Sequence, residues 1–80
     1  MRQTDKLFQP AHVHLKAGQA LTINNADQRI HNVRIYAPGL DFNSGVQEPG
    51  EAVTIPFTNP GSFDAFCGIH PQMRLRIDVE

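Results

Sequence analysis

Cysteine is scarce in this sequence, since Cys67 is the only one among 80 residues, and tryptophan is absent. A lone cysteine rules out a disulfide within the chain. The net charge of −1 gives no electrostatic argument for binding nucleic acid or an acidic membrane surface. No segment approaches the ~18 consecutive apolar residues that span a bilayer. The opening residues MRQTDK are polar, so no signal peptide is visible, and a removed leader remains a hypothesis.

The length of the chain is that of one small domain, which we expect to span residues 1–80. A chain of this size buries only about 60% of its unfolded surface, so its stability margin is thin. Small domains often compensate with disulfides or a bound metal. Because a disulfide is excluded, a metal or a very efficient core is expected.

Helical periodicity is missing, whereas alternation of apolar and polar residues with a period of two recurs along the chain. Such alternation is typical of strands with one buried face. With a short first strand around Leu7–Phe8, about seven strands are expected, the others lying within residues 12–15, 20–24, 31–36, 52–57, 62–67 and 75–79. Turn residues separate them, as in EPGE and NPGS. This pattern predicts an all-β fold, an antiparallel sandwich or barrel.

Two segments qualify this prediction. Pro56 lacks a backbone N–H, so its strand is expected at a sheet edge or at a bulge. Residues 37–47 show little periodicity and are expected to form a long surface connection.

The segment CGIHPQM carries a cysteine, a histidine and a methionine at three-residue intervals. Each has an ordinary interpretation: Cys67 as a small buried residue, His70 as a solvated residue and Met73 as packing. However, Gly68 permits unusual backbone angles, and Pro71 favours an extended conformation before it. Such a loop can turn three side chains towards one point.

A fourth ligand would have to come from another segment, and His31 is the best candidate. In a regular strand, His31 shares a face with Val33 and Ile35 and therefore points inward. Cys67 shares the inward face of Phe63 in the same way. The two side chains lie at strand ends, so they could meet.

Two histidines, one cysteine and a weak axial methionine form the ligand set of blue copper sites. The thiolate and thioether stabilise Cu(I), and the imidazoles bind both Cu(I) and Cu(II). Zinc could use the same ligands, although copper binds more tightly in the Irving–Williams order. The sequence thus predicts one metal site with ligands His31, Cys67, His70 and Met73.

Two long segments, FQPAHVHLKAGQALTINNADQRIHNV and FTNPGSFDAFCGIHPQM, resemble the characteristic segments of the cupredoxin family. The resemblance covers roughly residues 6–79. The Cys-x2-His-x2-Met spacing is similar to that of the amicyanin-like members, whereas plastocyanins and azurins have longer loops. Departures are Gln72 in place of an aromatic residue, Gly68 in place of a hydroxyl residue, and Leu75 at a position that is often glycine.

The resemblance implies a Greek-key sandwich that holds one type 1 copper ion and carries single electrons between redox partners. It implies the ligand roles given above, and a role for Asn32 in tying the two ligand loops together with its N–H facing the thiolate. It also implies a monomer, usually exported to the periplasm. Donor and acceptor proteins would dock transiently around the second histidine, near Ile30, Ile69, His70 and Pro71.

Three other functions compete with electron transfer. An enzyme is disfavoured, because multicopper oxidases need several His-x-His motifs, a binuclear copper centre needs two cysteines, and no feature supplies an oxyanion hole for acyl transfer. Copper storage, transfer or tolerance is the stronger alternative. It draws attention to His12 and His14, which are either solvated strand residues or a weak second metal site. A purely structural sandwich for adhesion leaves the four ligands unexplained.

Overall fold

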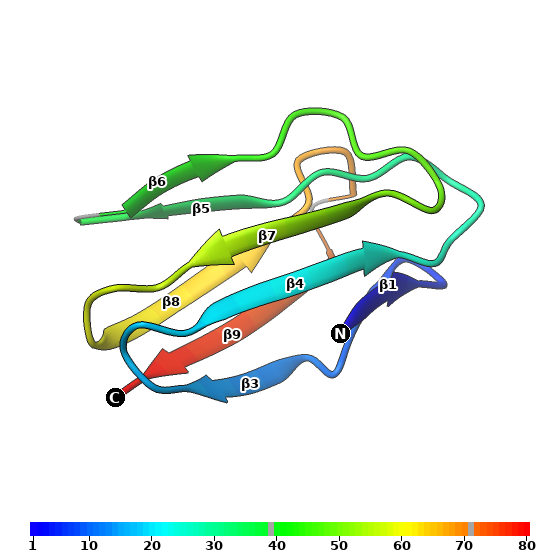
Figure 1. The fold of residues 1–80 in the computed structure, drawn as a ribbon. Helices are drawn as coiled ribbons and strands as arrows, with labels where there is room; N and C mark the ends of the chain where they lie inside the picture. The colour runs from blue at the N-terminus through cyan, green and yellow to red at the C-terminus, as the bar shows by residue number, and fades with distance from the viewer. Residues whose placement is uncertain (39, 71) are drawn as a thin grey trace.

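The computed structural model describes residues 1–38, 40–70 and 72–80, which form nine strands and no helix. The four-stranded sheet has the order β2-β1-β4-β7, and the five-stranded sheet has the order β3-β9-β8-β5-β6. Figure 1 shows β4 and β7 of the first sheet crossing in front of β8 and β9 of the second. The strands are β1 (Arg2–Thr4), β2 (Leu7–Gln9), β3 (His12–Leu15), β4 (Ala20–Asn25), β5 (Arg34–Ala37), β6 (Leu40–Asn43), β7 (Ala52–Pro56), β8 (Gly61–Phe66) and β9 (Arg74–Val79).

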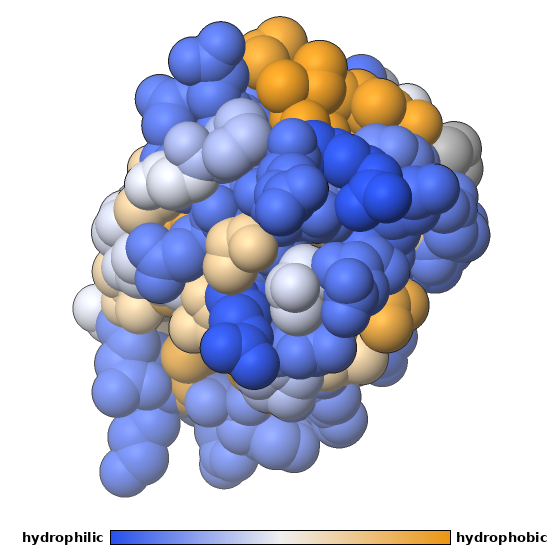
Figure 2. Space-filling view, turned by 90° about the vertical axis from the view of Figure 1, so that its right-hand side faces the viewer, coloured by the Kyte–Doolittle hydropathy of each residue, from blue (hydrophilic) through white to orange (hydrophobic). Residues whose placement is uncertain are grey.

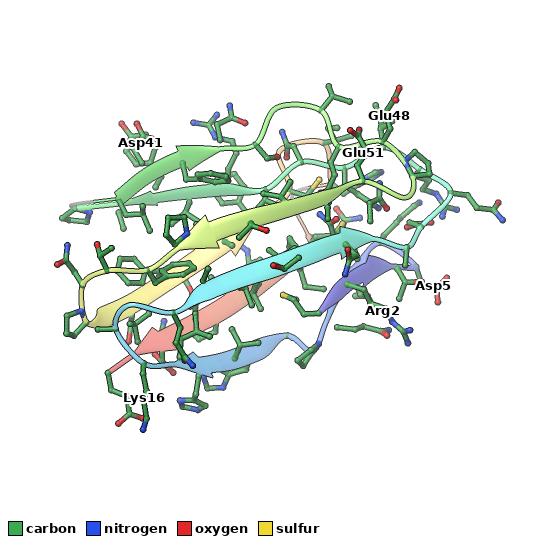
Figure 3. The ribbon with its side chains drawn as sticks, viewed as in Figure 1. Arg2, Asp5, Lys16, Asp41, Glu48 and Glu51 are labelled. Carbon is green, nitrogen blue, oxygen red and sulfur yellow. The ribbon has the colours of Figure 1, made fainter. Side chains whose placement is uncertain are left out.

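The core lies between the two sheets and consists of the residues that alternate inward along the strands. Each large apolar side chain that is fully buried contributes about 1.5–3 kcal/mol. Charged side chains such as Lys16, Asp41 and Glu48 extend away from the sandwich (Figure 3). The predicted β-sandwich is therefore confirmed, with a core of Phe8, Leu21, Ile23, Val33, Ile35, Ile55, Phe57, Phe63, Ala65, Cys67, Met73, Leu75, Ile77 and Val79.

The strand number and the pairing differ from the sequence prediction. Two strands are additional: β1, which is too short and polar to show a pattern, and β6, which lies in the segment expected to be a surface connection. In β6, Leu40 and Phe42 pack against the core, while Asp41 and Asn43 are exposed. Most neighbouring strands are antiparallel, as predicted, but β1 pairs with β4 and β3 with β9 in parallel, so both sheets are mixed. Such pairs join strands distant in sequence, which local alternation does not reveal.

The position of Pro56 agrees with the prediction, because β7 is an edge strand of its sheet. None of the described segments is a helix that could cross a membrane.

One end of the sandwich gathers the connections that carry the candidate ligands. His31 follows the β4–β5 connection and exchanges two backbone hydrogen bonds with Gln47, of 3.0 and 2.7 Å. Cys67 directly follows β8, and Met73 directly precedes β9.

Figure 2, turned by 90° from Figure 1, shows a largely hydrophilic surface with separate apolar areas.

Candidate metal centre

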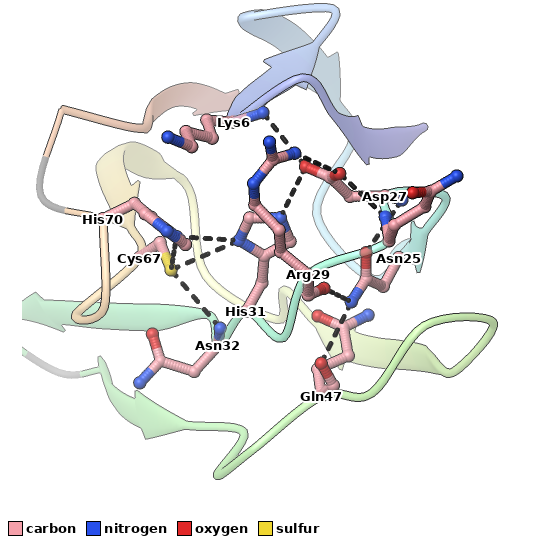
Figure 4. A network of polar contacts seen from close by, with 10 residues as sticks. Lys6, Asn25, Asp27, Arg29, His31, Asn32, Gln47, Cys67 and His70 are labelled. Atoms are coloured by element: carbon pink, nitrogen blue, oxygen red, sulfur yellow. Dashed lines mark hydrogen bonds and ion pairs between the residues drawn. The ribbon is translucent and has the colours of Figure 1, made fainter.

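Three potential ligand atoms from two loops meet at this end of the sandwich (Figure 4). His31 and Cys67 are fully buried, and His70 is half-buried. The Cys67 Sγ lies 3.7 Å from His31 Nδ1 and 4.0 Å from His70 Nδ1. The two Nδ1 atoms are 3.2 Å apart. The structure thus brings together the histidine from before β5 and the cysteine and histidine from after β8.

These separations suit a metal ion. The circle through three atoms separated by 3.2, 3.7 and 4.0 Å has a radius of about 2.1 Å, close to metal–nitrogen and metal–thiolate bond lengths of about 2.0–2.3 Å. The donor set of one thiolate and two imidazoles suits copper or zinc. The residues present therefore fit a bound metal without a large rearrangement.

Met73 is placed beside this loop by its backbone. Its N–H donates to the His70 carbonyl at 2.9 Å, and its own carbonyl accepts a hydrogen bond from the Cys67 N–H at 3.3 Å. Its side chain is fully buried in the core. Backbone hydrogen bonds thus connect Met73 to both Cys67 and His70, so the methionine is held close to the two other candidate ligands of this loop.

Asn32 connects the two loops. Its backbone N–H faces the Cys67 Sγ at 3.4 Å, and its side-chain Oδ1 accepts a hydrogen bond from the Gly68 N–H at 2.6 Å. A Cβ atom at position 68 would lie 3.3 Å from the Asn32 Nδ2, which is a tight contact. The position after the cysteine therefore contributes only its backbone to the tie, and glycine lets the two loops approach closely.

Asp27 is a functional residue that the sequence reasoning missed. Its Oδ2 lies 3.0 Å from His31 Nε2, on the side of the ring opposite the potential metal. A carboxylate accepts a hydrogen bond from the Nε2–H group, which leaves the Nδ1 lone pair directed at the cluster. Asp27 is therefore the residue that fixes the tautomer and orientation of His31.

The Asp27 carboxylate is held in place by several donors. It accepts hydrogen bonds from the backbone N–H groups of Lys6 and Gln28, and it forms an ion pair with Arg29 at 2.9 Å. Burial alone would raise its pKa, but the hydrogen bonds with His31, Lys6, Gln28 and Arg29 hold the pKa well below its usual range. Asp27 is thus a carboxylate at neutral pH. Its only sequence signal is its place four residues before His31, within a segment that reads as an ordinary polar turn.

Two buried amides support the same loop. The Asn25 Nδ2 donates to the carbonyls of Arg29 and Gln47, at 2.9 and 3.0 Å, and the Asn25 Oδ1 accepts from the Asp27 N–H. The Gln47 Nε2 donates to the carbonyls of Ile23 and Glu51. These contacts hold the backbone on both sides of His31, so this candidate ligand is preorganised.

His70 forms the outer edge of the cluster. Partial burial, and then the nearby charges of His31, Lys6 and Arg29, lower its pKa from the ordinary histidine value. The neighbouring Ile30 and Ile69 are 45% and 42% exposed. Pro71, the fourth residue of the expected docking surface, lies outside the described residues.

Comparison with known proteins defines the family. The family model of the cupredoxin-like domain matches residues 1–77, and the chain belongs to this family. It is 33% identical over 76 residues to amicyanin-alpha of Methylorubrum extorquens, covering 91% of this chain and 64% of that one. For amicyanin of Paracoccus denitrificans, the identity is 29%, with 91% and 58% coverage. The chain thus spans less than two thirds of these curated relatives.

Solved structures of amicyanin variants show the same fold. A reduced variant superimposes with a TM-score of 0.90 and 26% identity, covering 100% of this chain and 81% of that chain. A Cu(I) form of another variant gives a TM-score of 0.90 and 25% identity, with the same coverage. The chain is therefore similar to amicyanin in sequence and in three-dimensional structure.

Proposed function

We propose that this chain is a type 1 copper protein that carries single electrons, with His31, Cys67, His70 and Met73 as its ligands. The observation that carries the proposal is the convergence of a buried cysteine sulfur and two imidazole Nδ1 atoms at separations of 3.2–4.0 Å. The similarity to amicyanin, including a Cu(I) form, supports copper as the metal. Met73 would complete the set with its thioether, the weak additional ligand that such sites use.

Copper bound there would supply a one-electron Cu(II)/Cu(I) couple. The chain's own residues keep the site fixed during the exchange. Asp27 holds a proton at His31 Nε2, and the Asn32 N–H faces the Cys67 sulfur and stabilises its negative charge. The surrounding core excludes water. Ligands held in this way need not rearrange when the charge on the metal changes.

The half-buried edge of His70 is the proposed route for the electron. Ile69 precedes His70 in the sequence, and Ile30 precedes His31; both side chains are exposed and would form the apolar part of a docking surface. The largely hydrophilic surface in Figure 2 and the net charge of −1 suit a small, transient interface with a donor and an acceptor. Monomeric behaviour and a periplasmic location belong to the same proposal, because the cupredoxins that this chain resembles are usually exported.

A carrier is proposed in preference to an enzyme because Cys67 is fully buried, which leaves its sulfur out of reach of a substrate. Copper storage or transfer is the second candidate. The observation that favours it is a group of exposed metal-binding side chains, His12, His14 and Asp78, away from the buried cluster.

The experiment that tests the proposal is a visible absorption spectrum after one equivalent of Cu(II) is added. An intense thiolate-to-copper band, bleached by ascorbate and restored by an oxidant, is expected. Cys67→Ala should lose the band completely, while His14→Ala should keep it. A colourless wild-type protein that still binds Cu(I) would favour copper handling over electron transfer.

The role of Met73 has a separate test. Met73→Leu removes the thioether but preserves the volume of a buried side chain, so the protein should fold and keep copper. If the Met73 sulfur is a ligand, its loss should raise the reduction potential, because this weak ligand tunes the potential of such sites. Voltammetry on both proteins measures the change. An unaltered potential would show that Met73 is not a ligand.

A further inference from the structure

A second group of metal-binding side chains lies on the outer face of the five-stranded sheet. His12 and His14 alternate outward along β3, the edge strand, while Val13 and Leu15 between and after them pack against the core. β3 pairs in parallel with β9, where His14 is opposite Asp78. Two imidazoles and a carboxylate from neighbouring strands are thus placed side by side by the pleat of the sheet.

The potential ligand atoms of these three side chains lie close together. One nitrogen of each ring and one oxygen of Asp78 are all within 4.8 Å of one another. His12 Nε2 is 2.6 Å from Asp78 Oδ2, and the centroids of the two rings are 4.7 Å apart. The side chains of His12 and Asp78 are 52% and 29% exposed, so an ion can reach them from solvent.

The orientation of the Asp78 carboxylate is fixed by contacts with Ser62 and Arg76. The Ser62 hydroxyl donates to Asp78 Oδ1 at 2.6 Å, and the Arg76 Nε lies 3.4 Å from the same oxygen. Both groups occupy Oδ1, which leaves Oδ2 directed at His12. Arg76 also places a positive charge near the site, which opposes the binding of a cation.

We propose that His12, His14 and Asp78 form a second metal site for a divalent transition ion, Zn²⁺ or Cu²⁺. Imidazole and carboxylate donors suit these ions, and the absence of a thiolate makes the site unsuited to Cu(I). An ion would replace the hydrogen bond between His12 and Asp78. With metal–ligand bonds of about 2.0 Å and tetrahedral angles, the two donor atoms would move from 2.6 Å to about 3.3 Å apart. The exposed His12 side chain can make this small adjustment.

Occupation of this site would link the edge strand to its neighbour. β3 is held to the rest of its sheet on one side only, by β9. A metal bound by His12, His14 and Asp78 would join the two strands through their side chains in addition to their backbones. Solvent would complete the coordination, so the ion would exchange readily.

The test is a titration of the copper-loaded protein with Zn²⁺, followed by calorimetry and by NMR of the backbone amides. One additional zinc ion per chain should bind, with the shift changes centred on residues 12–14 and 78. His12→Ala, His14→Ala and Asp78→Asn should each weaken zinc binding by more than about tenfold, since even partners outside the ligand set are typically worth about 10–100-fold.

The matched control is Asp64→Asn. Asp64 is a carboxylate on the same sheet face that contacts Arg76 but does not belong to the cluster. This variant should bind zinc as the wild type does. The unchanged copper spectrum of each variant would show that it is folded. Zinc binding that survives all three substitutions, shift changes confined to the buried cluster, or no zinc binding at all would overturn the proposal.

Discussion

The protein contains two histidine clusters whose environments are opposite. The His31–Cys67–His70 cluster is enclosed by loops at the end of the sandwich, and its carboxylate partner, Asp27, is buried. The His12–His14–Asp78 cluster lies on an open sheet face. In the first, loop contacts fix each ligand before any metal arrives; in the second, the regular pleat brings exposed side chains together. The comparison indicates that burial and outer hydrogen bonds, and not the presence of histidines alone, make a site rigid.

The largest difference should appear when the carboxylate partner of the buried cluster is removed. Asp27→Ala leaves Arg29, the buried His31 ring and two partly buried backbone N–H groups without their acceptor, so the free energy of unfolding of the metal-free protein should fall by about 3 kcal/mol. Asp64→Ala, at an exposed carboxylate, should change it by less than about 0.5 kcal/mol. Urea denaturation at pH 7 measures both. Equal losses in the two variants would contradict the structural role of Asp27.

A smaller effect is expected from cutting the tie between the ligand loops. Asn32→Ala removes the acceptor of the Gly68 N–H, at a cost of about 1 kcal/mol, and should make the loop after Cys67 more mobile. Hydrogen exchange of the Gly68 amide should become faster. Asn24→Ala, at an exposed position of β4, is the control and should leave this amide unchanged. Protection of Gly68 that persists without Asn32 would show that the loop is held by other contacts.

The smallest effect is expected at the exposed cluster, where a fall in pH should remove the contribution of Asp78 to stability. The hydrogen bonds from Ser62 and His12 lower the pKa of Asp78 to about 2. Because the pKa is lower in the folded state, this carboxylate stabilises the fold at neutral pH and loses that contribution as the pH falls from about 5 to about 2. The melting temperatures of the metal-free wild type and Asp78→Asn should therefore converge over this range. A constant difference between them would mean that the carboxylate charge does not contribute.

The sequence was informative where a residue's role depends on local pattern. Alternation predicted the inward faces of His31 and Cys67, which are both fully buried, and the spacing of the CGIHPQM loop predicted that His70 lies near them. The absence of a hydroxyl at Gly68 correctly indicated a tie made by the backbone. The ligand roles remain predictions until metal binding is measured.

The sequence was uninformative where a residue's role depends on long-range contacts. Asp27 sits in a polar segment that reads as a turn, and only the folded chain shows that His31, Lys6 and Arg29 surround it. Similarly, β1 has three residues and is recognisable only through its pairing with β2 and β4. The juxtaposition of His12 with Asp78 joins positions 66 residues apart, which no local pattern encodes.

The parallel pairing of β3 with β9 has a consequence for the order of assembly. β9 lies between β3 and β8, so β3 has no neighbour in the five-stranded sheet until the residues of β9 have been synthesised. Long sequence separation between contacting strands slows folding, typically to roughly milliseconds or seconds. During synthesis, the apolar side chains Val13 and Leu15 of β3 therefore stay without their neighbouring strand until the end of the chain has been made.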